Sequence, residues 1–463
     1  MIDKKIIKEI INELEQCLGK EKVFTQPEYL ISYSYDATGT QSMPDIVVFP
    51  ETERDIQNIL KIAFVHKIPV TPRGAGVGLT GGSIPVQNGI ALVFTKMNKI
   101  LTIDTENFYA AVEPGVVTYD LQQAVEKLGL FYPPDPASLK TSTIGGNVAE
   151  NAGGLRCFKY GVTKNYVLGL EAFLMNGEKI HSGSPVLKDV AGYDIKSLLT
   201  GSEGTLAVIS KILLRLIPMP AYRRLFRVDF RSLHTGAEFI NLMIRAKISP
   251  SVLEFMDKSS IAAVYQYMNL PLNPEIDASI LVELDGSKTD VEERKDLFLE
   301  LVKQKERDVV ANTMAVTQAE QDELWNTRRN ISPAISKLKG KKINEDIVVP
   351  TAKIPETVAY INTLAKEYNI TVILFGHFGD GNIHTNLMVN PTDKEEMKRA
   401  EQVLDKIFRH VIAVNGSITG EHGVGTTKKN FMKYQFTETE MTLFKNIKKA
   451  FDPENLLNPG KIF

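Results

Sequence analysis

The chain has 463 residues, which is enough for two or three domains, and a hydrophobic content of 43% allows a large core. Its 54 basic and 56 acidic residues nearly balance, which argues against nucleic acid or an anionic membrane as the main partner. Two cysteines in unrelated contexts, Cys17 and Cys157, fit a reducing compartment and exclude an iron–sulfur cluster ligated by cysteines of this chain alone. The N-terminus lacks a signal-peptide pattern and no window reaches the roughly 18 apolar residues of a membrane span, so we expect a cytoplasmic protein.

The first half of the chain has an α/β pattern. We expect an amphipathic helix over residues 3–18, an irregular stretch over 20–44, and a capping box at Thr52 and Asp55 that begins the next helix. Asn176-Gly177 predicts a hairpin turn, and an antiparallel hairpin argues against a purely parallel sheet. The other expected elements are strands at 46–49, 68–70, 89–94, near 101, near 110 and over 204–217, and a helix near 121–128.

The pattern changes after Pro218 and Pro220, which look like a boundary. Strand-like and helical stretches alternate there and predict an antiparallel sheet with helices on one side. The expected strands are 225–230, 252–256, 280–283 and 309–316, and the expected helices lie around 239–244 and 297–302. Four capping-box patterns mark further helix starts, at Thr289/Glu292, Thr317/Glu320, Thr392/Glu395 and Thr437/Glu440.

The segment TPRGAGVGLTGGS, residues 71–83, contains five glycines. Such density costs conformational entropy on folding, and bare backbone is useful where successive N–H groups surround a phosphate. A Rossmann or Walker loop should open directly into a helix, but a strand-like run follows here and the Walker lysine is absent. The segment therefore predicts a diphosphate held between strands. The alternative is a glycine-rich surface turn.

Two further glycine-rich segments follow, over residues 133–154 and 201–204. Prolines fix the backbone of the first, and Gly145-Gly146 and Gly153-Gly154 let it approach a flat ligand. Three such loops in one domain suggest a long cofactor with a diphosphate and a ring system, whereas the alternative is loops that bind nothing.

Three histidines fall close together in glycine-rich segments, in GHFGDGNIH and TGEHGVG. A hairpin turning at Asp380-Gly381 would pair His377 with His384, with Cβ atoms roughly 5 Å apart. Adjacent residues of an extended segment point opposite ways, so we assign Glu421 to a metal and leave His422 as a base. Two histidines and one carboxylate suit zinc, iron or manganese. These groups could instead be satisfied histidines in turns, or a hydrolase site, which would leave the glycine loops unexplained.

Arg328 and Ser332 lie four residues apart on the helix that begins near Thr317, so we expect them to share a face. An arginine beside a hydroxyl is a good clamp for a carboxylate. The alternative is a solvated helix face.

Six segments in the right order resemble one family: PRGAGVGLTGG, PPDPAS with IGGN and NAGG, GSEGTLAVIS, GHFGDGNIH, TGEHGVG and ENLLNPGKIF. They resemble the FAD-linked 2-hydroxy-acid dehydrogenases, the D-lactate dehydrogenase and glycolate oxidase catalytic-subunit group of the vanillyl-alcohol-oxidase fold. The resemblance runs from about residue 45 to the C-terminus. It implies an α+β fold, with a PCMH-type FAD-binding domain and a cap domain whose antiparallel sheet is covered by helices.

We expect four parts: an N-terminal helix and lead-in over 1–44, the PCMH-type FAD-binding domain over 45–219, a cap domain with the metal site over 220–415, and a C-terminal segment over 416–463 that returns to the FAD domain. The resemblance also implies roles for particular residues. It implies His377, His384 and Glu421 as metal ligands, His422 as the base, and Arg328, Ser332 and Asn386 as substrate contacts. The implied cofactor-binding residues are Pro72, Arg73, Gly74, Ala75, Gly76, Gly78, Leu79, Thr80, Gly81, Gly82, Pro136, Ser138, Thr143, Gly145, Gly146, Asn147, Asn151, Gly153, Gly154, Gly161, Glu203, Gly204, Ile209 and Asn458.

Two departures from family patterns refine this expectation. Members selective for a larger dicarboxylate carry a lysine where we align Asn344, so D-lactate or glycolate is the expected substrate and D-2-hydroxyglutarate an alternative. Residues 72–83 contain no histidine, so we expect non-covalent FAD.

The expected activity is oxidation of the 2-hydroxy acid with hydride transfer to flavin and a divalent metal bound. Electrons would pass to an electron-transferring flavoprotein, an iron–sulfur subunit or a quinone, and a homodimer is possible. The rivals are a flavin transferase that resembles alkyl-glycerone-phosphate synthase and a non-catalytic electron-relay subunit.

Overall fold

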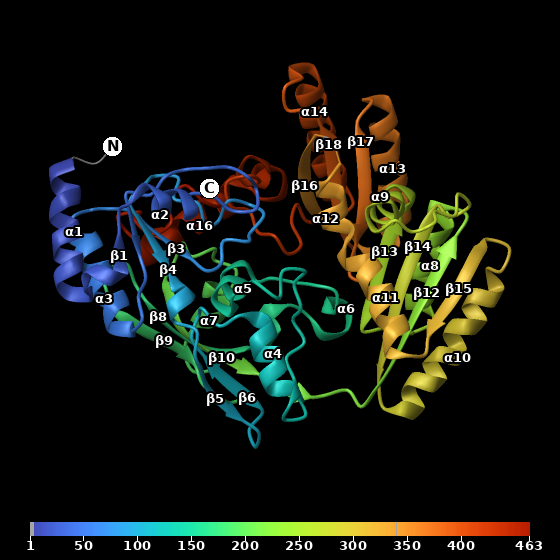
Figure 1. Cartoon of the computed structure of the whole chain (residues 1–463), viewed down its shortest axis with the longest axis horizontal. Coiled ribbons are helices and arrows are strands. Elements are labelled where there is room, and N and C mark those ends of the chain that lie inside the picture. Colours follow the sequence, from blue (N-terminus) through green and yellow to red (C-terminus); the bar gives the residue numbers. More distant parts are fainter. Residues whose placement is uncertain (1–3, 339) are drawn as a thin grey trace. The chain divides into compact units, whose positions relative to one another are not determined.

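The computed structural model describes residues 4–338 and 340–463 (Figure 1). The chain folds into two compact units. The first takes in the chain up to Gly153, Val162–Met219 and Glu421–Phe463. The second takes in Gly154–Gly161 and Pro220–Gly420. The first unit is thus built from three separated segments, and the short segment Gly154–Gly161 leaves it to join the second.

A small mixed sheet carries the N-terminal part of the first unit. Its strand order is β1-β2-β4-β3, and β2 and β3 both run parallel to β4. Helices α1 and α3 pack together and share a buried apolar cluster with the sheet. The Thr52–Asp55 capping box at the start of α3 is confirmed. The bounds are α1 Lys4–Leu18, β1 Val23–Phe24, β2 Ile46–Val48, α3 Glu53–Val65, β3 Val70–Arg73 and β4 Ile90–Val93. Residue 3 of the expected first helix lies outside the described residues.

The sequence predicted an irregular stretch over residues 20–44, but the structure shows regular elements in part of it. It contains β1 and the short helix α2 Pro27–Ser32, which begins with proline at its first position. Proline tolerates the first turn of a helix because its missing N–H has no intrahelical partner there. The sequence signal was weak because both elements are so short.

The second sheet of the first unit is antiparallel throughout, with strand order β5-β6-β10-β8-β9. The hairpin between β8 and β9 turns at Asn176-Gly177 as predicted, and Gly177 has φ of 83°. The bounds are β5 Ile100–Asp104, β6 Tyr109–Val112, α4 Thr118–Glu126, β7 Leu130–Phe131, α5 Ile144–Glu150, α6 Cys157–Tyr160, β8 Val167–Phe173, β9 Lys179–Gly183, α7 Ile195–Leu199, β10 Val208–Arg215 and β11 Ile217–Pro218.

The second glycine cluster is partly helical rather than a loop throughout. Thr143 caps α5 by accepting a hydrogen bond from the amide of Gly146 at 3.2 Å. A Cβ atom on Gly145 would lie 2.6 Å from the Cβ of Pro114, so this glycine permits close packing of α5. Gly145 and Gly146 therefore also serve the packing and capping of α5 within the protein.

The second unit contains a seven-stranded antiparallel sheet with strand order β15-β12-β14-β13-β17-β18-β16. The strand bounds are β12 Tyr222–Phe230, β13 Val252–Asp257, β14 Ala278–Gly286, β15 Val309–Ala315, β16 Lys341–Val348, β17 Thr371–Gly376 and β18 Asn382–Val389. The helix bounds are α8 Leu233–Arg245, α9 Lys258–Met268, α10 Lys288–Gln304, α11 Gln318–Arg329, α12 Ile331–Ser336, α13 Ile354–Glu367 and α14 Lys394–Ala413.

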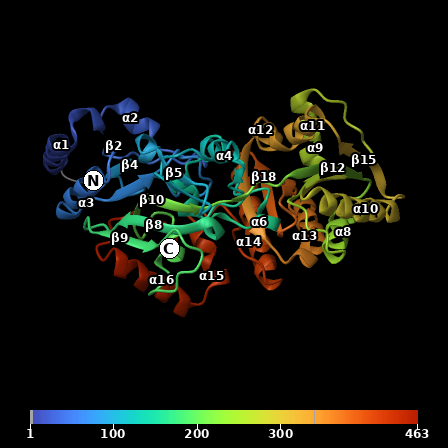
Figure 2. The ribbon, with the colours of Figure 1, turned by 90° about the horizontal axis from the view of Figure 1, so that it is seen from below.

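Helices cover both faces of this sheet, so the expectation of helices on one side is wrong. Figure 2 shows α9, α11 and α12 on one side of the strands and α8, α10 and α13 on the other. Phe226 and Phe230 pack against α10 and α8, whereas Met256 and Ile373 share a buried cluster with α9 and α12. Both faces can be covered because the strands carry apolar residues in long runs rather than in strict alternation.

Two of the four capping boxes in the second half are confirmed, at Thr317 and at Thr437, which begins α16 Glu438–Phe451. The other two helix starts differ from the expectation. Ser287 caps α10, and Asp393 caps α14 by accepting hydrogen bonds from the amides of Glu395 and Glu396. In both cases a second capping residue lies within two positions of the expected threonine, so the sequence offered two solutions.

The C-terminal segment runs beside β3 of the first unit. The amide of Val70 donates to the carbonyl of Leu456 at 2.8 Å, and the amide of Asn458 donates to the carbonyl of Val70 at 2.7 Å.

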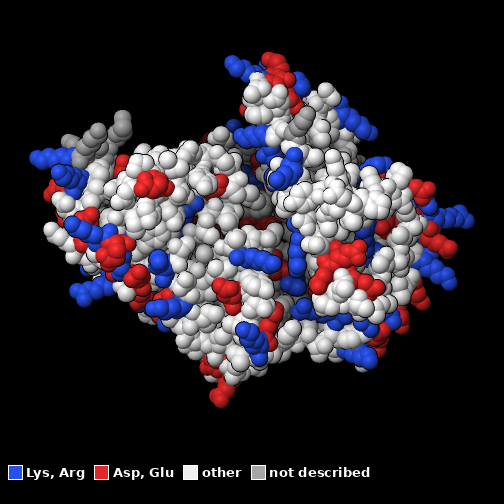
Figure 3. Space-filling view, viewed as in Figure 1, with Lys and Arg blue, Asp and Glu red and all other residues white. Residues whose placement is uncertain are grey.

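On the face drawn in Figure 3, basic and acidic residues are interspersed, as expected from the near-zero net charge. None of the described helices has the length and apolar character that a membrane crossing requires.

Candidate functional site

The glycine loop over residues 74–82 joins β3 to the segment that leads into β4 of the first unit. Among the described residues, none accepts a hydrogen bond from a backbone amide of residues 74–82. A Cβ atom on Gly78 would meet nothing within 4 Å. Backbone amides without protein acceptors, beside open space, are what an anion-binding loop requires.

Arg73 stands at the start of this loop and is only 5% exposed. Its Nη1 reaches the carbonyl and hydroxyl oxygens of Ser83 at 3.4 Å each, and its Nε has no partner. Burial lowers the pKa of Arg73. A buried guanidinium with unused donors, next to free amides, fits the diphosphate of FAD.

Of the residues expected to bind the cofactor, Gly154 and Gly161 belong to the second unit and the others to the first. Asn147 donates to the hydroxyl of Thr118 at 2.7 Å, and Asn151 ends α5 in a left-handed conformation with φ of 53°. Asn458 donates to the carbonyls of Gly82 and Glu203 at 2.8 Å each, which ties the tail to the glycine loop. Ile209 lies in β10, and Glu203 contacts the backbone of residues 424–425.

His377 and His384 come together in the second unit, but with a register different from the expected one. His384 pairs with Phe375, not with His377, because the connection between β17 and β18 spans five residues. Gly376 and Gly381, with φ of 151° and 87°, form this longer turn. The two Nε2 atoms nevertheless lie 3.4 Å apart, and both side chains are buried.

Glu254 of β13 orients this histidine pair. Its Oε1 lies 2.5 Å from Nδ1 of His377, and its carboxylate is fully buried. Nδ1 therefore carries the proton, which leaves the lone pair of Nε2 directed toward His384. A carboxylate behind a histidine in this way is typical of metal ligands.

Glu421 completes the group. It directly follows Gly420, whose amide donates to Asp346 of β16 at 2.8 Å. Ligand atoms of His377, His384 and Glu421 all lie within 4.8 Å of one another. Two nitrogens bound to one tetrahedral zinc at about 2.0–2.1 Å would be about 3.3–3.4 Å apart, which matches the spacing of the histidine pair. The side chains thus fit a metal ion.

We expected the side chains of Glu421 and His422 to point in opposite directions, but they approach each other. The chain bends here, and Nε2 of His422 lies 3.7 Å from a carboxylate oxygen of Glu421. The hydroxyl of Thr80 donates to the carbonyl of His422 at 2.9 Å. The backbone of His422 is therefore attached to the first glycine loop.

Arg328 and Ser332 do not share one helix. The helix ends at Arg329 and a new one begins at Ile331, because Pro333 lacks the N–H that would bond to the carbonyl of Arg329. Arg328 is buried against Glu254, with Nε and Nη2 both near Oε2 at 2.6 and 2.5 Å. Two of its donors are thus engaged within the protein.

One face of β16 and β18 carries a row of polar side chains beside this group. His384 lies opposite Asp346, and Asn386 lies opposite Asn344. The side-chain oxygens of both asparagines are buried without a partner. Nζ of Lys342, on the same face of β16, donates to the hydroxyl of Ser332 at 3.1 Å, and burial lowers its pKa. This face has unused polar groups that suit a polar ligand.

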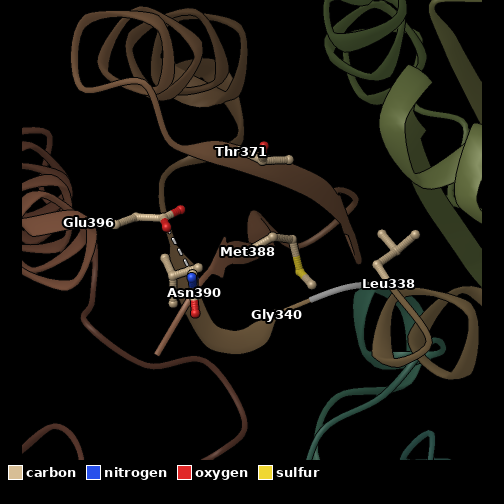
Figure 4. A pocket seen from close by; sticks show the side chains of 7 residues that line it. Leu338, Gly340, Thr371, Met388, Asn390 and Glu396 are labelled. Atoms are coloured by element: carbon tan, nitrogen blue, oxygen red, sulfur yellow. Dashed lines mark hydrogen bonds between the residues drawn. The ribbon is translucent and has the colours of Figure 1, made fainter. Parts of the chain in front are cut away.

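A surface hollow of about 540 Å³ lies at the end of the same strands, where Asn390 and Glu396 are joined by a hydrogen bond (Figure 4). It contains none of the predicted site residues. Met388 in its lining is four residues from His384, which is roughly 13 Å along a strand. Its lining residues are Leu338, Gly340, Thr371, Met388, Val389, Asn390 and Glu396. The hollow is therefore separate from the histidine pair.

Sequence reasoning missed Glu254, Asp346 and Lys342. Each is a charged residue within a strand: Glu254 lies in the mainly apolar VLEFMD, and Asp346 and Lys342 lie in the mixed KKINEDIV. A charge at an inward-facing strand position is a usable signal, because such a group needs a partner when it is buried.

Comparisons with known proteins agree with this arrangement. Residues 44–183 match the FAD binding domain family, and residues 219–462 match the C-terminal domain of the FAD linked oxidases. The chain belongs to the FAD-linked oxidases. It is therefore a flavoprotein and an oxidoreductase of this family.

Relatives of similar length carry related names. The chain is 42% identical to the glycolate oxidase subunit GlcD of Bacillus subtilis over 99% of this chain and 97% of that protein. It is 36% identical to the subunit of the same name from Escherichia coli K12, over 96% and 89%. It is 33% identical to a D-lactate dehydrogenase of Anaerostipes hadrus, over 99% and 98%.

Solved structures show the same fold at lower identity. A p-cresol methylhydroxylase with substrate bound aligns with a TM-score of 0.83 and 19% identity, over 100% of this chain and 97% of that chain. A 4-ethylphenol oxidase from Gulosibacter chungangensis aligns with a TM-score of 0.79 and 18% identity, over 100% and 98%. The expected PCMH-type FAD-binding fold with a helix-covered antiparallel sheet is confirmed.

Proposed function

We propose that this FAD-linked oxidoreductase oxidises a small D-2-hydroxy acid, glycolate or D-lactate, to the 2-oxo acid. The proposal rests above all on the buried pair His377 and His384, with Glu254 behind it and Glu421 within reach. The relatives named for glycolate and D-lactate, matched over nearly the whole chain, support this choice of substrate. The D configuration rests on these names alone.

His377, His384 and Glu421 are the proposed ligands of a divalent metal, for which zinc, iron and manganese are candidates. Such an ion lowers the pKa of a hydroxyl group bound to it. The protein holds the ligand set ready because Glu254 keeps the proton of His377 on Nδ1. His422 is the proposed base, which accepts the hydroxyl proton on a ring nitrogen.

The substrate carboxylate would be bound by groups that this chain leaves available. Arg328 keeps Nη1 beyond the two donors that face Glu254. The side-chain oxygen of Asn386 is buried without a partner and would instead accept a hydrogen bond from the substrate hydroxyl. Arg73 and the amides of residues 74–82 would hold the diphosphate of FAD. Bound flavin supplies the acceptor for the hydride from the substrate carbon. We propose non-covalent binding, since residues 72–83 include no histidine.

A larger 2-hydroxy dicarboxylate is a second candidate substrate, and one observation favours it. Although Asn344 is not a lysine, Lys342 stands two residues away on the same face of β16, bound to Ser332. A half-buried ammonium group beside a hydroxyl could bind a second carboxylate. A relative at 32% identity is named D-2-hydroxyglutarate dehydrogenase.

Electrons would leave the flavin to a partner protein or a quinone. Two relatives are named as subunits, which supports a protein partner such as an electron-transferring flavoprotein or an iron–sulfur subunit. Neither cysteine, Cys17 nor Cys157, takes part in a disulfide bond.

One spectroscopic panel tests the proposal. The purified flavoprotein is mixed under anaerobic conditions with glycolate, D-lactate, L-lactate or D-2-hydroxyglutarate, and the visible absorbance of the flavin is followed. Bleaching by glycolate or D-lactate is expected. Bleaching only by D-2-hydroxyglutarate would select the second candidate, and an oxidised flavin with all four acids would refute oxidation of these hydroxy acids.

A further inference from the structure

The turn that carries His422 is attached to a distant part of the first unit through Glu203. Oε1 of Glu203 accepts a hydrogen bond from the amide of Val424 at 2.7 Å, and Oε2 accepts one from the amide of Gly425 at 2.7 Å. Glu203 precedes these residues by more than 200 positions. Both oxygens of one carboxylate thus bind two successive amides just after His422.

The surroundings of Glu203 show that this contact is built into the fold. The residue is 5% exposed and has φ of 52°, in the left-handed region, within the glycine-flanked turn 201–204. Burial raises the pKa of its carboxyl group, whereas the two amides and the charges of Lys461 and Lys428 act in the opposite direction. A buried carboxylate in a strained turn persists only where the surrounding structure supports it.

Thr80 holds the other side of the same turn. The hydroxyl of Thr80 donates to the carbonyl of His422 at 2.9 Å, and the carbonyl of Thr80 accepts from the amide of Thr426 at 2.8 Å. Gly425 packs closely against Thr80, since a Cβ atom on Gly425 would lie 2.1 Å from the Thr80 carbonyl oxygen. The turn therefore has no room to shift toward Thr80. His422 is therefore bracketed by fixed contacts at its own carbonyl and at the second and third amides after it.

We propose that Glu203 and Thr80 are positioning residues, which fix the backbone of the turn 422–425 and thereby the direction of the His422 imidazole. This assigns to Glu203 a role other than binding the cofactor, because both of its oxygens are already engaged by protein amides. The proposal rests on the role of His422 as the base in the proposed function. Misplacement of a reacting group by 1 Å can cost about 100-fold in rate, so the turn needs such support.

Glu203→Gln is the decisive variant, because it keeps the shape of the side chain but turns one acceptor into a donor facing an amide. Thr80→Val removes the hydroxyl that binds the His422 carbonyl, and Thr80→Ser keeps it. Glu106→Gln, at an exposed position in the β5–β6 turn, is the matched control for the loss of a carboxylate.

Three quantities are measured on the flavin-loaded protein: bound FAD per chain, the limiting rate of anaerobic flavin reduction with its apparent substrate affinity, and hydrogen–deuterium exchange in residues 421–428. For Glu203→Gln and Thr80→Val we expect full FAD content, a limiting rate lowered by about tenfold or more, and substrate affinity within about threefold of wild type. For Glu203→Gln we also expect faster exchange at Val424 and Gly425. Glu106→Gln should behave as wild type, and Thr80→Ser, which keeps the hydroxyl, should reduce its flavin faster than Thr80→Val.

Wild-type reduction rates in both Glu203→Gln and Thr80→Val would overturn the proposal. Loss of FAD from a folded Glu203→Gln protein would also overturn it, since that result assigns Glu203 to the cofactor. If the Gln variant does not fold, the comparison of Thr80→Val with Thr80→Ser decides. If none of the acids reduces the wild-type flavin, the proposed function fails. Hydrogen–deuterium exchange then still tests the contact, because unchanged exchange at Val424 and Gly425 in Glu203→Gln would show that Glu203 does not hold these amides.

Discussion

Glu254 and His377 lie 2.5 Å apart between a carboxylate oxygen and Nδ1, and both are buried in the second unit. The other oxygen of Glu254 faces Arg328, so one carboxylate connects a proposed metal ligand to a proposed substrate contact. Glu254 therefore supports both the proposed metal site and the proposed substrate site, although it is itself neither a metal ligand nor a substrate contact.

Replacement of Glu254 by glutamine should weaken the metal site. Gln can still accept one hydrogen bond from His377, but it lacks the charge that raises the basicity of the histidine. Loss of such an outer partner typically lowers metal affinity by about 10- to 100-fold. Metal content per chain after dialysis against a weak chelator measures this effect, and Glu300→Gln, exposed on α10, is the control. Equal metal retention in both variants would show that Glu254 does not support a metal ligand.

Arg328 should matter for stability as well as for substrate binding. Arg328→Met leaves the carboxylate of Glu254 buried without its main cation, which typically costs about 3–5 kcal/mol. The side chains are only 7% and 0% exposed, so solvent screens this interaction little. Denaturant unfolding of Arg328→Met, Glu254→Gln and the double variant measures the coupling. Strictly additive losses would mean that the pair does not act as a unit.

Asp257 predicts a pH dependence of stability. Burial raises its pKa to about 6, although it accepts hydrogen bonds from the amides of Leu374 and Ser260. Between about pH 4, near the usual value of an unfolded chain, and about pH 6, the folded protein keeps a proton that the unfolded chain releases. The contribution of Asp257 to stability therefore falls as the pH rises through this window, by up to roughly 3 kcal/mol.

Asp257→Asn cannot titrate and isolates this contribution. Urea unfolding of both proteins from pH 4 to pH 7 should show the wild type losing stability relative to the variant as the pH rises. Parallel curves over the whole range would contradict the assignment, because all other groups titrate alike in the two proteins.

Arg73 should favour FAD binding without favouring the folded apoprotein. Its guanidinium is buried with an unsatisfied Nε, so Arg73→Met removes a costly charge from the empty protein. Loss of charge-assisted hydrogen bonds to the diphosphate costs about 1.5–3 kcal/mol, or roughly 10- to 150-fold in FAD affinity. Titration of the apoprotein with FAD gives the affinity, and Arg54→Met on the exposed side of α3 is the control. Unchanged FAD affinity would remove Arg73 from the cofactor site.

The sequence predicted helix starts and turns well where a short local motif satisfies the backbone by itself. The capping boxes at Thr317 and Thr437 and the Asn176-Gly177 turn formed as predicted, because each satisfies backbone groups within a few residues. The break after Arg329 could also have been found, since Pro333 cannot continue the hydrogen bonding of the preceding helix.

Contacts between distant residues were beyond such reasoning. Glu254 reaches His377 across 123 positions and Arg328 across 74, and only the order of strands in the sheet brings them together. The histidine pair was recognisable as a hairpin pair, but its register depended on the left-handed Gly381 and the length of the turn. The role of Asp346 likewise depends on a segment 74 residues later in the chain.

The most direct test of the account is flavin reduction with and without metal. The protein is treated with a chelator, freed of the chelator, and mixed anaerobically with the acid that bleaches the untreated flavin best, before and after zinc or manganese is added back. We predict that chelation leaves FAD bound but abolishes bleaching, and that added metal restores it. Equally fast bleaching by the metal-free protein would contradict a site in which His377, His384 and Glu421 bind a metal needed for oxidation.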